Sequence, residues 1–309
     1  MGVTLDLQEA LSQDSTVRNQ LRDVAHALAR SRRVLIVTGA GISCGSGIPD
    51  FRTPGGLFDK AKKRFGIDGR DLFSTIIFKR YGGVEAFNKL MGELKETVYH
   101  AQPTRTHHFI KRLDSLRVLL RCYTQNIDGL EELAGIPESL VATSGCTYRD
   151  GKSVQLHGTI RKLRCISCAA QCDWTEDYVE SFKSGVAPDC PACKNEDQLR
   201  NRQGRRSATI GRLRPAIILY EEVHPLGDDI ADLQNYDKQC QPDFLIVMGT
   251  SLKIAALVDV VKIFADGLGE NAIFVNKEPV NATLNKIFGY HIQGDAGAWV
   301  DLVLEDWEQ

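Results

Sequence analysis

Short apolar runs alternate with longer helical segments along most of this chain. Runs typical of buried strands occupy residues 33–38, 117–123, 215–220, 244–248 and 272–275. Segments expected to be helical occupy residues 16–31, 105–116, 226–237, 254–267 and 296–305. This alternation is typical of a parallel sheet with helices on both faces. The pattern predicts an α/β fold built on a doubly wound, Rossmann-like sheet.

Two stretches interrupt the alternation. Residues 53–100 are less regular and rich in Lys, Gly and Phe, which indicates a cofactor-binding loop and a helical module. Residues 153–204 contain five Cys, four of them in two pairs, and few long apolar runs, which indicates a zinc-binding module. The Rossmann-like domain is then expected to combine residues 1–52, 101–152 and 205–309. A small inserted domain, made of the two modules, would lie between its halves.

Polar loops follow two of the predicted strands, those at residues 33–38 and 117–123. The first loop holds Gly39, Ala40, Gly41 and Ser43, and the second holds Gln125, Asn126, Ile127 and Asp128. In an open parallel sheet, ligands bind beyond the carboxyl ends of the strands. Glycines let the backbone approach a pyrophosphate, and the start of a following helix offers N–H donors to it. The two loops therefore predict a dinucleotide site.

The usual dehydrogenase fingerprint is incomplete in this chain. Its third glycine would stand where the chain has Cys44, and Asp59, at the spacing of about 20 residues expected for the acid, lies in no strand pattern. NAD binding is expected, but ordinary hydride transfer is not. The glycines alone are also compatible with a structural turn. Asp50, Phe51 and Arg52 weigh against that alternative, because an acid, an aromatic ring and a guanidinium suit a charged heteroaromatic ligand.

Two further strand ends carry polar groups. Gly249, Thr250 and Ser251 follow the run at residues 244–248, and Asn276 follows the run at 272–275. These positions belong to the same carboxyl edge of the predicted sheet, where hydroxyl and amide groups suit a ribose or an adenine. An ordinary turn explains each of them equally well when it is taken alone.

Four cysteines have the spacing of a metal site. Cys165 and Cys168 form one C-x2-C pair, and Cys190 and Cys193 form another 21 residues later. Two such pairs place four thiolates around one zinc ion. A closed shell of four thiolates leaves no open position, so the zinc is expected to be structural. Free or disulfide-paired thiols are the alternative, and Cys172 is a weaker candidate ligand.

His157 ends a short strand just before the cysteine-rich stretch. The unperturbed pKa of an imidazole, about 6.5, suits a general base near neutral pH. An isolated His is also often structural, so this assignment needs the neighbouring loops for support.

Composition narrows the class of protein. The 309 residues carry a net charge of -2, which gives no global reason to expect nucleic-acid binding. Six arginines between residues 200 and 214 form a local basic stretch, and either DNA contact or a solvated loop would explain it. No apolar run is long enough for a membrane span. The N-terminus lacks the pattern of a secretory signal, so an intracellular protein is expected, and nine Cys would be many for such a protein unless some of them bind metal.

Taken together, these motifs resemble those of the sirtuins, the NAD-dependent protein-lysine deacylases, from about residue 20 to residue 305. The resemblance rests on residues 39–43, 47–52, 124–128, 156–158, 249–251, 276–279 (Asn276-Lys277-Glu278-Pro279) and 294–295, and on the two cysteine pairs. Cys44 and the phrase from Tyr220 to Pro225 look most like the fungal nuclear histone-deacetylase branch. A nuclear location follows from this resemblance alone.

The resemblance implies a role for each motif. Pyrophosphate would be held by Ala40, Gly41, Ser43 and Arg52. The nicotinamide pocket would consist of Asp50, Phe51, Asn126 and Asp128, with Gln125 at the adjoining ribose. The adenosine half would contact Gly249, Ser251, Asn276 and the backbone near Ala296. His157 would take a proton from the ribose, and Asn126 would position ribose and water. NAD would be consumed, and acetyl-lysine, for example in a histone, would become lysine.

One departure from the family pattern concerns the expected substrate groove. The usual Phe-Gly-Glu is Tyr220-Glu221-Glu222 here, in a loop expected to pair with the substrate peptide. Glu221 would be strained if the backbone there has a positive φ. Ala296 stands where Cys is common, next to the adenine. Two other functions stay open, namely mono-ADP-ribosyl transfer to protein and non-catalytic reading of NAD or ADP-ribose.

Overall fold

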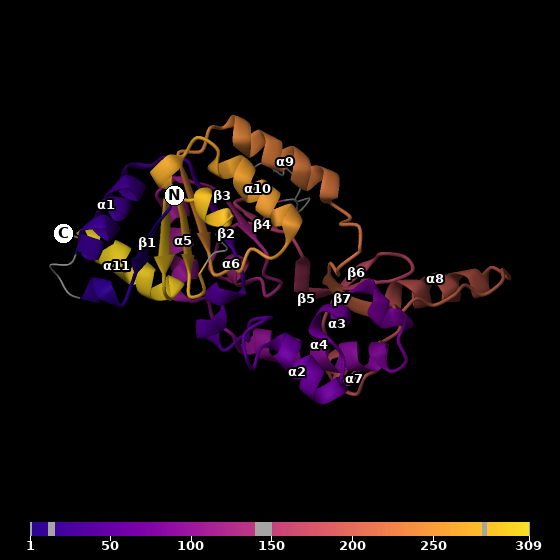
Figure 1. Ribbon diagram of the computed structural model, residues 1–309. Helices are drawn as coiled ribbons and strands as arrows, with labels where there is room; N and C mark the ends of the chain where they lie inside the picture. The colour runs from indigo at the N-terminus through magenta and orange to yellow at the C-terminus, as the bar shows by residue number, and fades with distance from the viewer. Residues whose placement is uncertain (1, 12–15, 140–149, 280–282, 309) are drawn as a thin grey trace.

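A seven-stranded parallel sheet forms the centre of the larger lobe (Figure 1). The computed structural model describes residues 2–11, 16–139, 150–279 and 283–308. Across the sheet the strands are β1 (Val3–Asp6), β10 (Tyr290–Gln293), β9 (Ala272–Asn276), β8 (Phe244–Met248), β2 (Val34–Thr38), β3 (Leu119–Thr124) and β4 (Ser153–Gln155). Every neighbouring pair is parallel.

Helices cover both faces of this sheet. One face packs against α1 (Thr16–Arg30), α5 (Arg105–Ser115) and α11 (Ala296–Glu308), and the other packs against α9 (Gly227–Gln239) and α10 (Ala255–Ala265). Because strand side chains alternate between faces, Val34 and Ile36 join the first core while Leu35 and Val37 join the second. The predicted doubly wound fold is confirmed. In the part of the chain that the structure describes, no helix is long and apolar enough to cross a membrane.

Strands β2 and β8 lie side by side where the winding of the chain changes direction. The chain continues from β2 to β3 on one side, and from β8 to β9 on the other. The loops that leave the two strands therefore diverge and open a crevice at the carboxyl edge, which is where doubly wound folds bind ligands.

A smaller lobe lies beside that edge. Its sheet pairs β5 (Gly158–Cys165) with β6 (Gln171–Asp173) and β7 (Leu213–Ile217), all antiparallel. The elements packed around it are α2 (Leu57–Phe65), α3 (Gly69–Leu72), η4 (Thr75–Lys79), α4 (Gly83–His100), α7 (Glu176–Lys183) and α8 (Pro191–Arg202). In Figure 1, α8 projects away from both lobes.

The three-part division of the chain stays a prediction. The position of one strand, β7, is relevant to where its boundaries lie. The apolar run at 215–220 was assigned to the large sheet, but β7 pairs with β5 in the small one. The chain enters β7 from the cysteine-rich stretch, and the N–H of Leu213 bonds to Pro188 O. Residues 140–149 of the expected domain lie outside the described residues.

The glycine loop contradicts one detail of the sequence analysis. Instead of a helix, two short 3-10 turns follow β2, η2 (Ala40–Ile42) and η3 (Cys44–Ser46), and Gly47 ends the second with φ of 80°. The N–H groups of Gly41, Ile42 and Ser43 donate to carbonyl oxygens of the protein itself. These three amides are therefore not free donors for a pyrophosphate.

Candidate active site and metal centre

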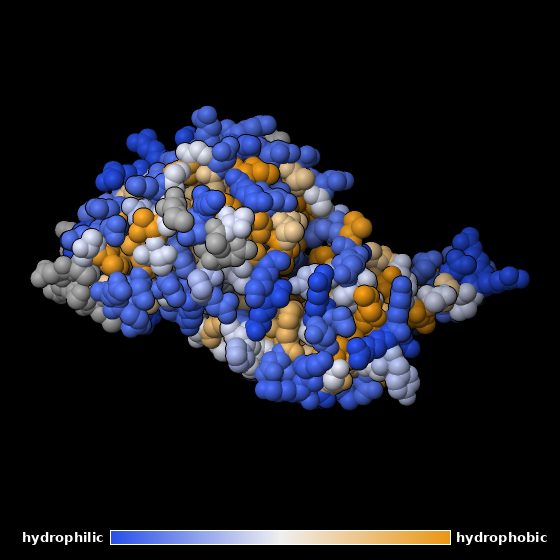
Figure 2. Space-filling model, in the orientation of Figure 1, coloured by the Kyte–Doolittle hydropathy of each residue, from blue (hydrophilic) through white to orange (hydrophobic). Residues whose placement is uncertain are grey.

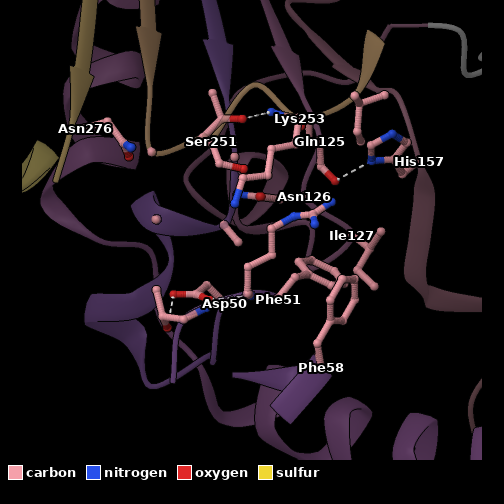
Figure 3. A pocket seen from close by; sticks show the side chains of 18 of the residues that line it. Asp50, Phe51, Phe58, Gln125, Asn126, Ile127, His157, Ser251, Lys253 and Asn276 are labelled. Atoms are coloured by element: carbon pink, nitrogen blue, oxygen red, sulfur yellow. Dashed lines mark hydrogen bonds between the residues drawn. The ribbon is translucent and has the colours of Figure 1, made fainter. Parts of the chain in front are cut away.

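A cavity of about 740 Å³ lies at the carboxyl ends of β2, β3, β8 and β9 (Figure 3). Its volume falls in the range of roughly 300–1,000 Å³ that is usual for cofactor and substrate sites. Among the predicted site residues, those that line it are Gly39, Ala40, Gly41, Asp50, Phe51, Arg52, Gln125, Asn126, Ile127, His157, Tyr220, Glu221, Glu222, Gly249, Thr250, Ser251, Asn276, Lys277 and Ala296. Segments far apart in the sequence therefore meet in one cavity.

Ser43 and Asp128 do not line this cavity. They line a small adjoining cavity of about 20 Å³, which shares Ala40, Phe51, Asn126 and Ile127 with the large one. A space of that size holds about one water molecule. The residues expected around nicotinamide are thus divided between the two cavities.

Backbone contact between the loops after β2 and β8 sets the floor of the large cavity. The N–H of Gly41 donates to Gly249 O at 2.8 Å. A Cβ atom at Gly39 would stand 2.7 Å from Gly249 O, and one at Gly41 would stand 2.8 Å from Gly249 Cα. Side chains do not fit between these loops. The glycines therefore serve loop packing at least as directly as they serve ligand approach.

The loop after β3 is fixed from several sides. Gln125 Nε2 donates to Thr38 O at 3.0 Å and to Thr250 Oγ1 at 2.8 Å. Asn126 Nδ2 donates to Ser43 Oγ at 3.2 Å, and the side chain is only 3% exposed. Its Oδ1 is buried and has no hydrogen-bond partner among the described residues. A buried acceptor at the cavity wall without a partner is suited to a ligand hydroxyl or amide.

The loop from Asp50 to Thr53 closes another side of the cavity. Asp50 Oδ1 accepts the N–H groups of Arg52 and Thr53, both at 2.8 Å, and Oδ2 accepts the Thr53 hydroxyl. Burial alone would raise the pKa of Asp50, but these hydrogen bonds hold it below its ordinary range. The ring of Phe51 packs edge-on against Phe58 and Phe73. This loop presents an apolar wall beside a fixed carboxylate.

His157 lines the cavity between β4 and β5. Its Nδ1 lies 3.0 Å from Gln125 O, the contact drawn in Figure 3. Because a carbonyl oxygen only accepts, Nδ1 carries the proton, and Nε2 of the neutral ring keeps its lone pair. Burial lowers the pKa of the imidazole, and the bond to Gln125 offsets this only in part. The ring is therefore a neutral proton acceptor at neutral pH.

Positive charge reaches the cavity from three side chains. Lys277 Nζ bonds to Asp295 Oδ2 at 3.0 Å, and this bond raises the pKa of the lysine. Arg52 stacks over the ring of Phe58 at 5.2 Å. Lys253 also lines the cavity. Arg52 and Lys253 are thus the cations at hand for a phosphate group.

Several cavity residues were missed by sequence reasoning. Phe58 and Phe73 come from the helical module, and Ile217 and Leu219 come from the end of β7. The only sequence signal for them was that residues 53–100 are rich in Phe. That signal did not indicate which of these Phe residues would line the cavity. These apolar side chains form the wall that the small lobe contributes.

The predicted substrate loop forms a tight turn. The N–H of Glu222 bonds to Leu219 O, and Glu221 has φ of 63°. A turn whose third residue has positive φ favours glycine there. The Glu221 carboxylate accepts a hydrogen bond from buried Ser74. That bond holds a backbone conformation which the residue itself disfavours.

The four predicted zinc ligands come together in the small lobe. The sulfurs of Cys165, Cys168, Cys190 and Cys193 all lie within 4.8 Å of one another. Cys165 and Cys193 are 3.7 Å apart, and Cys168 and Cys190 are 3.8 Å apart. Four sulfurs at about 2.3 Å from one zinc would be separated by about 3.8 Å. The geometry therefore fits a tetrahedral structural zinc.

The pKa values within the cluster are shifted in different directions, since that of Cys165 is lowered while those of Cys190 and Cys193 are raised. Burial raises the pKa of the Cys165 thiol, but hydrogen bonds from the N–H groups of Cys168 and Ser167 outweigh it and lower the pKa to about 7. A thiol of this kind is readily present as the thiolate that a metal requires.

The arginine-rich stretch at residues 200–214 is partly engaged in ion pairs within the protein. Arg212 pairs with Asp189 at 2.7 Å, and Arg214 pairs with Glu222. Figure 2 shows hydrophilic residues over the projecting end of the small lobe, which α8 forms in Figure 1. DNA contact by this stretch stays a prediction.

A doubly wound fold with a cavity of mixed polar and apolar lining at its switch point, joined to a four-cysteine module, defines a class of dinucleotide-binding proteins. A model of the Sir2 family matches residues 39–256, and the chain belongs to this family. It is similar to the NAD-dependent histone deacetylase HST3 of Saccharomyces cerevisiae, with 39% identity over 296 residues. That match covers 91% of this chain and 66% of the relative.

Other relatives extend the comparison. The NAD-dependent protein deacylase 2 of Archaeoglobus fulgidus is 30% identical, and the match covers 94% of this chain and 97% of the relative. A solved structure of a Sir2 homologue with NAD is 25% identical, with a TM-score of 0.67 and 95% of each chain covered. The chain spans slightly less than two thirds, 66% and 65%, of the two fungal HST3 proteins that it matches.

Replacing Glu221 separates the backbone strain from the hydrogen bond to Ser74. Glu221→Ala loses the bond and keeps the positive φ, so we expect a loss of about 1–2 kcal/mol in the free energy of unfolding. Glu221→Gly relieves the backbone and should be about 1 kcal/mol more stable than the Ala variant. Urea unfolding measures the free energy of unfolding of both variants and of the wild-type protein. Val223, which has no positive φ, provides the control, because Gly should be less stable than Ala there.

Replacing Cys190 tests the metal centre. We expect Cys190→Ser to lose most of its zinc and to melt at a lower temperature, because three ligands leave the tetrahedral site open. Elemental analysis and thermal unfolding are the measurements. Cys240→Ser, outside the cluster, is the matched control. Full zinc content and an unchanged melting temperature in Cys190→Ser would contradict the assignment.

Proposed function

We propose that this protein is an NAD-dependent protein-lysine deacetylase. In the reaction, acetyl-lysine, NAD and water give lysine, nicotinamide and O-acetyl-ADP-ribose. The observation that carries the proposal is the neutral His157 imidazole, bonded to Gln125 O and facing the same cavity as the dinucleotide loops. The names of the relatives support it, since HST3 is an NAD-dependent histone deacetylase.

The residues of the large cavity fit NAD in charge and polarity. Arg52 and Lys253 would supply positive charge for the pyrophosphate, while Ser251 and Asn276 would supply polar groups for the adenosine half. The unpartnered Asn126 Oδ1 would accept a ribose hydroxyl. When bound, NAD supplies a ribose carbon made reactive by its nicotinamide leaving group.

The contribution of the protein is orientation, exclusion of water and one base. His157 Nε2 would take a proton from a hydroxyl placed beside it, as a general base does. Asn126 is held by Ser43 and would orient the ribose and the attacking water. The Phe51, Phe58 and Phe73 rings exclude water from one wall. Fixed geometry of this kind lowers the entropic part of a barrier.

Two other functions compete with deacetylation. Protein mono-ADP-ribosyl transfer would use the same NAD site, and a non-catalytic reader of NAD or ADP-ribose would need no base. His157 with Asn126 favours deacetylation, because a reader gains nothing from a neutral imidazole beside the cofactor loops. The product distinguishes them, since only the deacetylase gives O-acetyl-ADP-ribose.

Histones are the proposed substrates, and the nucleus is the proposed location, on the basis of the fungal relatives. Chromatin proteins are then the proposed partners. The arginines near the end of α8 are the proposed place for any direct contact with DNA phosphates.

Mass spectrometry of acetylated histone peptides, incubated with and without NAD, tests the function. We expect NAD-dependent loss of acetyl groups together with O-acetyl-ADP-ribose. In His157→Ala the rate should fall by about 10²–10⁴-fold, the range for loss of a general base, with NAD affinity nearly unchanged. His108→Ala, at an exposed histidine next to the buried His107, is the control. Loss of NAD binding in His157→Ala would contradict the role, and ADP-ribosylated peptide would indicate the transferase.

The dependence of kcat/KM on pH, which reports groups of the free enzyme, tests the state of His157. Its pKa lies below the ordinary 6.5, so the neutral, active imidazole persists to lower pH than in a free histidine. As pH falls through the lowered pKa, the base becomes protonated and kcat/KM falls. We expect the midpoint of this acid limb below pH 6.5. A midpoint above pH 7 would show that another group controls the step.

A further inference from the structure

Tyr220 connects the loop expected to bind the substrate peptide with the cofactor side of the large cavity. It stands where the sirtuin pattern has Phe, so the phenol hydroxyl is the group that this departure adds. Arg52 Nη2 donates to that hydroxyl at 3.4 Å, a long hydrogen bond. Both residues line the large cavity. The roles proposed above assign the pyrophosphate to Arg52 and leave the hydroxyl without a function.

The backbone of Tyr220 is fixed by the helical module. Its N–H donates to Phe73 O at 2.8 Å, and its carbonyl oxygen accepts the N–H of Thr75 at 3.2 Å. Ser74, between them, forms a parallel bridge with Tyr220 and donates through its hydroxyl to Glu221. The path of the chain at Tyr220 therefore depends on these bonds and not on the phenol hydroxyl. A change to Phe leaves all of them in place.

The ring of Tyr220 is held as well. It is half-buried and packs against the apolar core around α4. The guanidinium of Arg70, on α3, lies 5.6 Å from the ring centroid, which is within the range of a cation–π contact. Phe would keep both contacts, because they involve the ring and not the hydroxyl. The hydroxyl is thus carried by a side chain whose backbone and ring are both fixed.

The side chain of Arg52 has less support of its own. It is exposed, and among the described residues its guanidinium contacts only the ring of Phe58, at 5.2 Å, and the hydroxyl of Tyr220. A ring face leaves a guanidinium free to turn within its own plane, whereas a hydrogen bond at Nη2 removes that freedom. Because the donors of a guanidinium have fixed directions in one plane, a bond at Nη2 also sets where Nη1 and Nε point.

The charge of Arg52 stays available to an anion. The two acids on the neighbouring loops have other partners, since Asp50 accepts main-chain N–H groups and Glu221 accepts the hydroxyl of Ser74. A neutral hydroxyl orients the guanidinium without neutralising it, whereas a carboxylate in the same place would compete with a phosphate and repel it. A phenol is therefore a suitable partner for an arginine that has to bind a phosphate group.

We propose that Tyr220 is a positioning residue for Arg52, and that its hydroxyl directs the guanidinium toward the pyrophosphate of the cofactor. The same bond holds the substrate loop at residues 220–222 and the cofactor loop at residues 50–53 in one arrangement. Tyr220 acts through Arg52, so its effect is on cofactor binding and not on the chemical step. This role rests on the proposed function, because NAD is the source of the pyrophosphate.

Calorimetric binding of ADP-ribose tests this role without turnover, because ADP-ribose carries the pyrophosphate but no nicotinamide. We expect Tyr220→Phe to bind it about three- to fivefold more weakly than the wild-type protein, the effect of one lost hydrogen bond. Tyr81→Phe, which removes a hydroxyl from a fully exposed tyrosine, is the control and should bind like the wild-type protein. Unchanged binding by Tyr220→Phe would overturn the proposal. Tighter binding would also overturn it, since the hydroxyl would then hold Arg52 away from the phosphates.

A double-mutant cycle shows whether the hydroxyl acts through Arg52. In an Arg52→Ala background, Tyr220→Phe should leave the affinity for ADP-ribose nearly unchanged, because the guanidinium that the hydroxyl directs is gone. Thermal unfolding of the four proteins controls for misfolding. An equal loss of affinity in both backgrounds would show that Tyr220 acts on the ligand or on the fold by another route, and would overturn the positioning role.

Steady-state kinetics of Tyr220→Phe gives a second readout. The KM for NAD should rise about three- to fivefold while kcat stays within about twofold, because a contact remote from the reacting carbon contributes equally to the ground state and the transition state. A fall in kcat with an unchanged KM would overturn the positioning role. Wild-type protein that binds ADP-ribose but removes no acetyl group would instead overturn the proposed function, while the binding of ADP-ribose by Tyr220→Phe would still decide the role of Tyr220.

Discussion

Backbone contact between two loops is the constraint on which the site depends. The loops after β2 and β8 touch through Gly39, Gly41 and Gly249, with the Gly41 N–H bonded to Gly249 O at 2.8 Å. Any side chain at these positions would separate the loops, and the two strand ends would no longer form one floor. Because β3 and β9 flank the same pair of strands, their polar loops also depend on this contact. The position of the cavity thus follows from where backbone meets backbone.

The reactive side chains are held mainly by main-chain groups. His157 is bonded to Gln125 O, and Asp50 accepts two backbone N–H groups. Main-chain partners carry no charge that titrates, so they fix a tautomer or an orientation over the whole working pH range. Groups placed this way need little reorganisation during a reaction.

The sequence predicted the parts of the fold that have strong apolar periodicity. Strands such as β8 and helices such as α1 agree with their runs to within a residue or two, because each is buried along a full face. Strands β1 and β10 were missed because they have only four residues each, and three of these in β10 are polar or partly exposed. Phe58 and Phe73 could not be assigned, since their roles come from contacts with distant segments. The four clustered cysteines were predictable because spacing alone encodes a tetrahedral site.

The small sheet couples two sites that share no residue. Strand β5 begins directly after His157 and ends at Cys165, and its partner β7 runs from Leu213 beside the cysteine cluster to Ile217 in the cavity wall. A strand of eight residues spans roughly 25 Å, so a metal at one end is too far away to act on the reaction directly. A bound zinc would stabilise the end of a sheet whose other end fixes His157. A structural zinc would therefore influence catalysis through the rigidity of two strands.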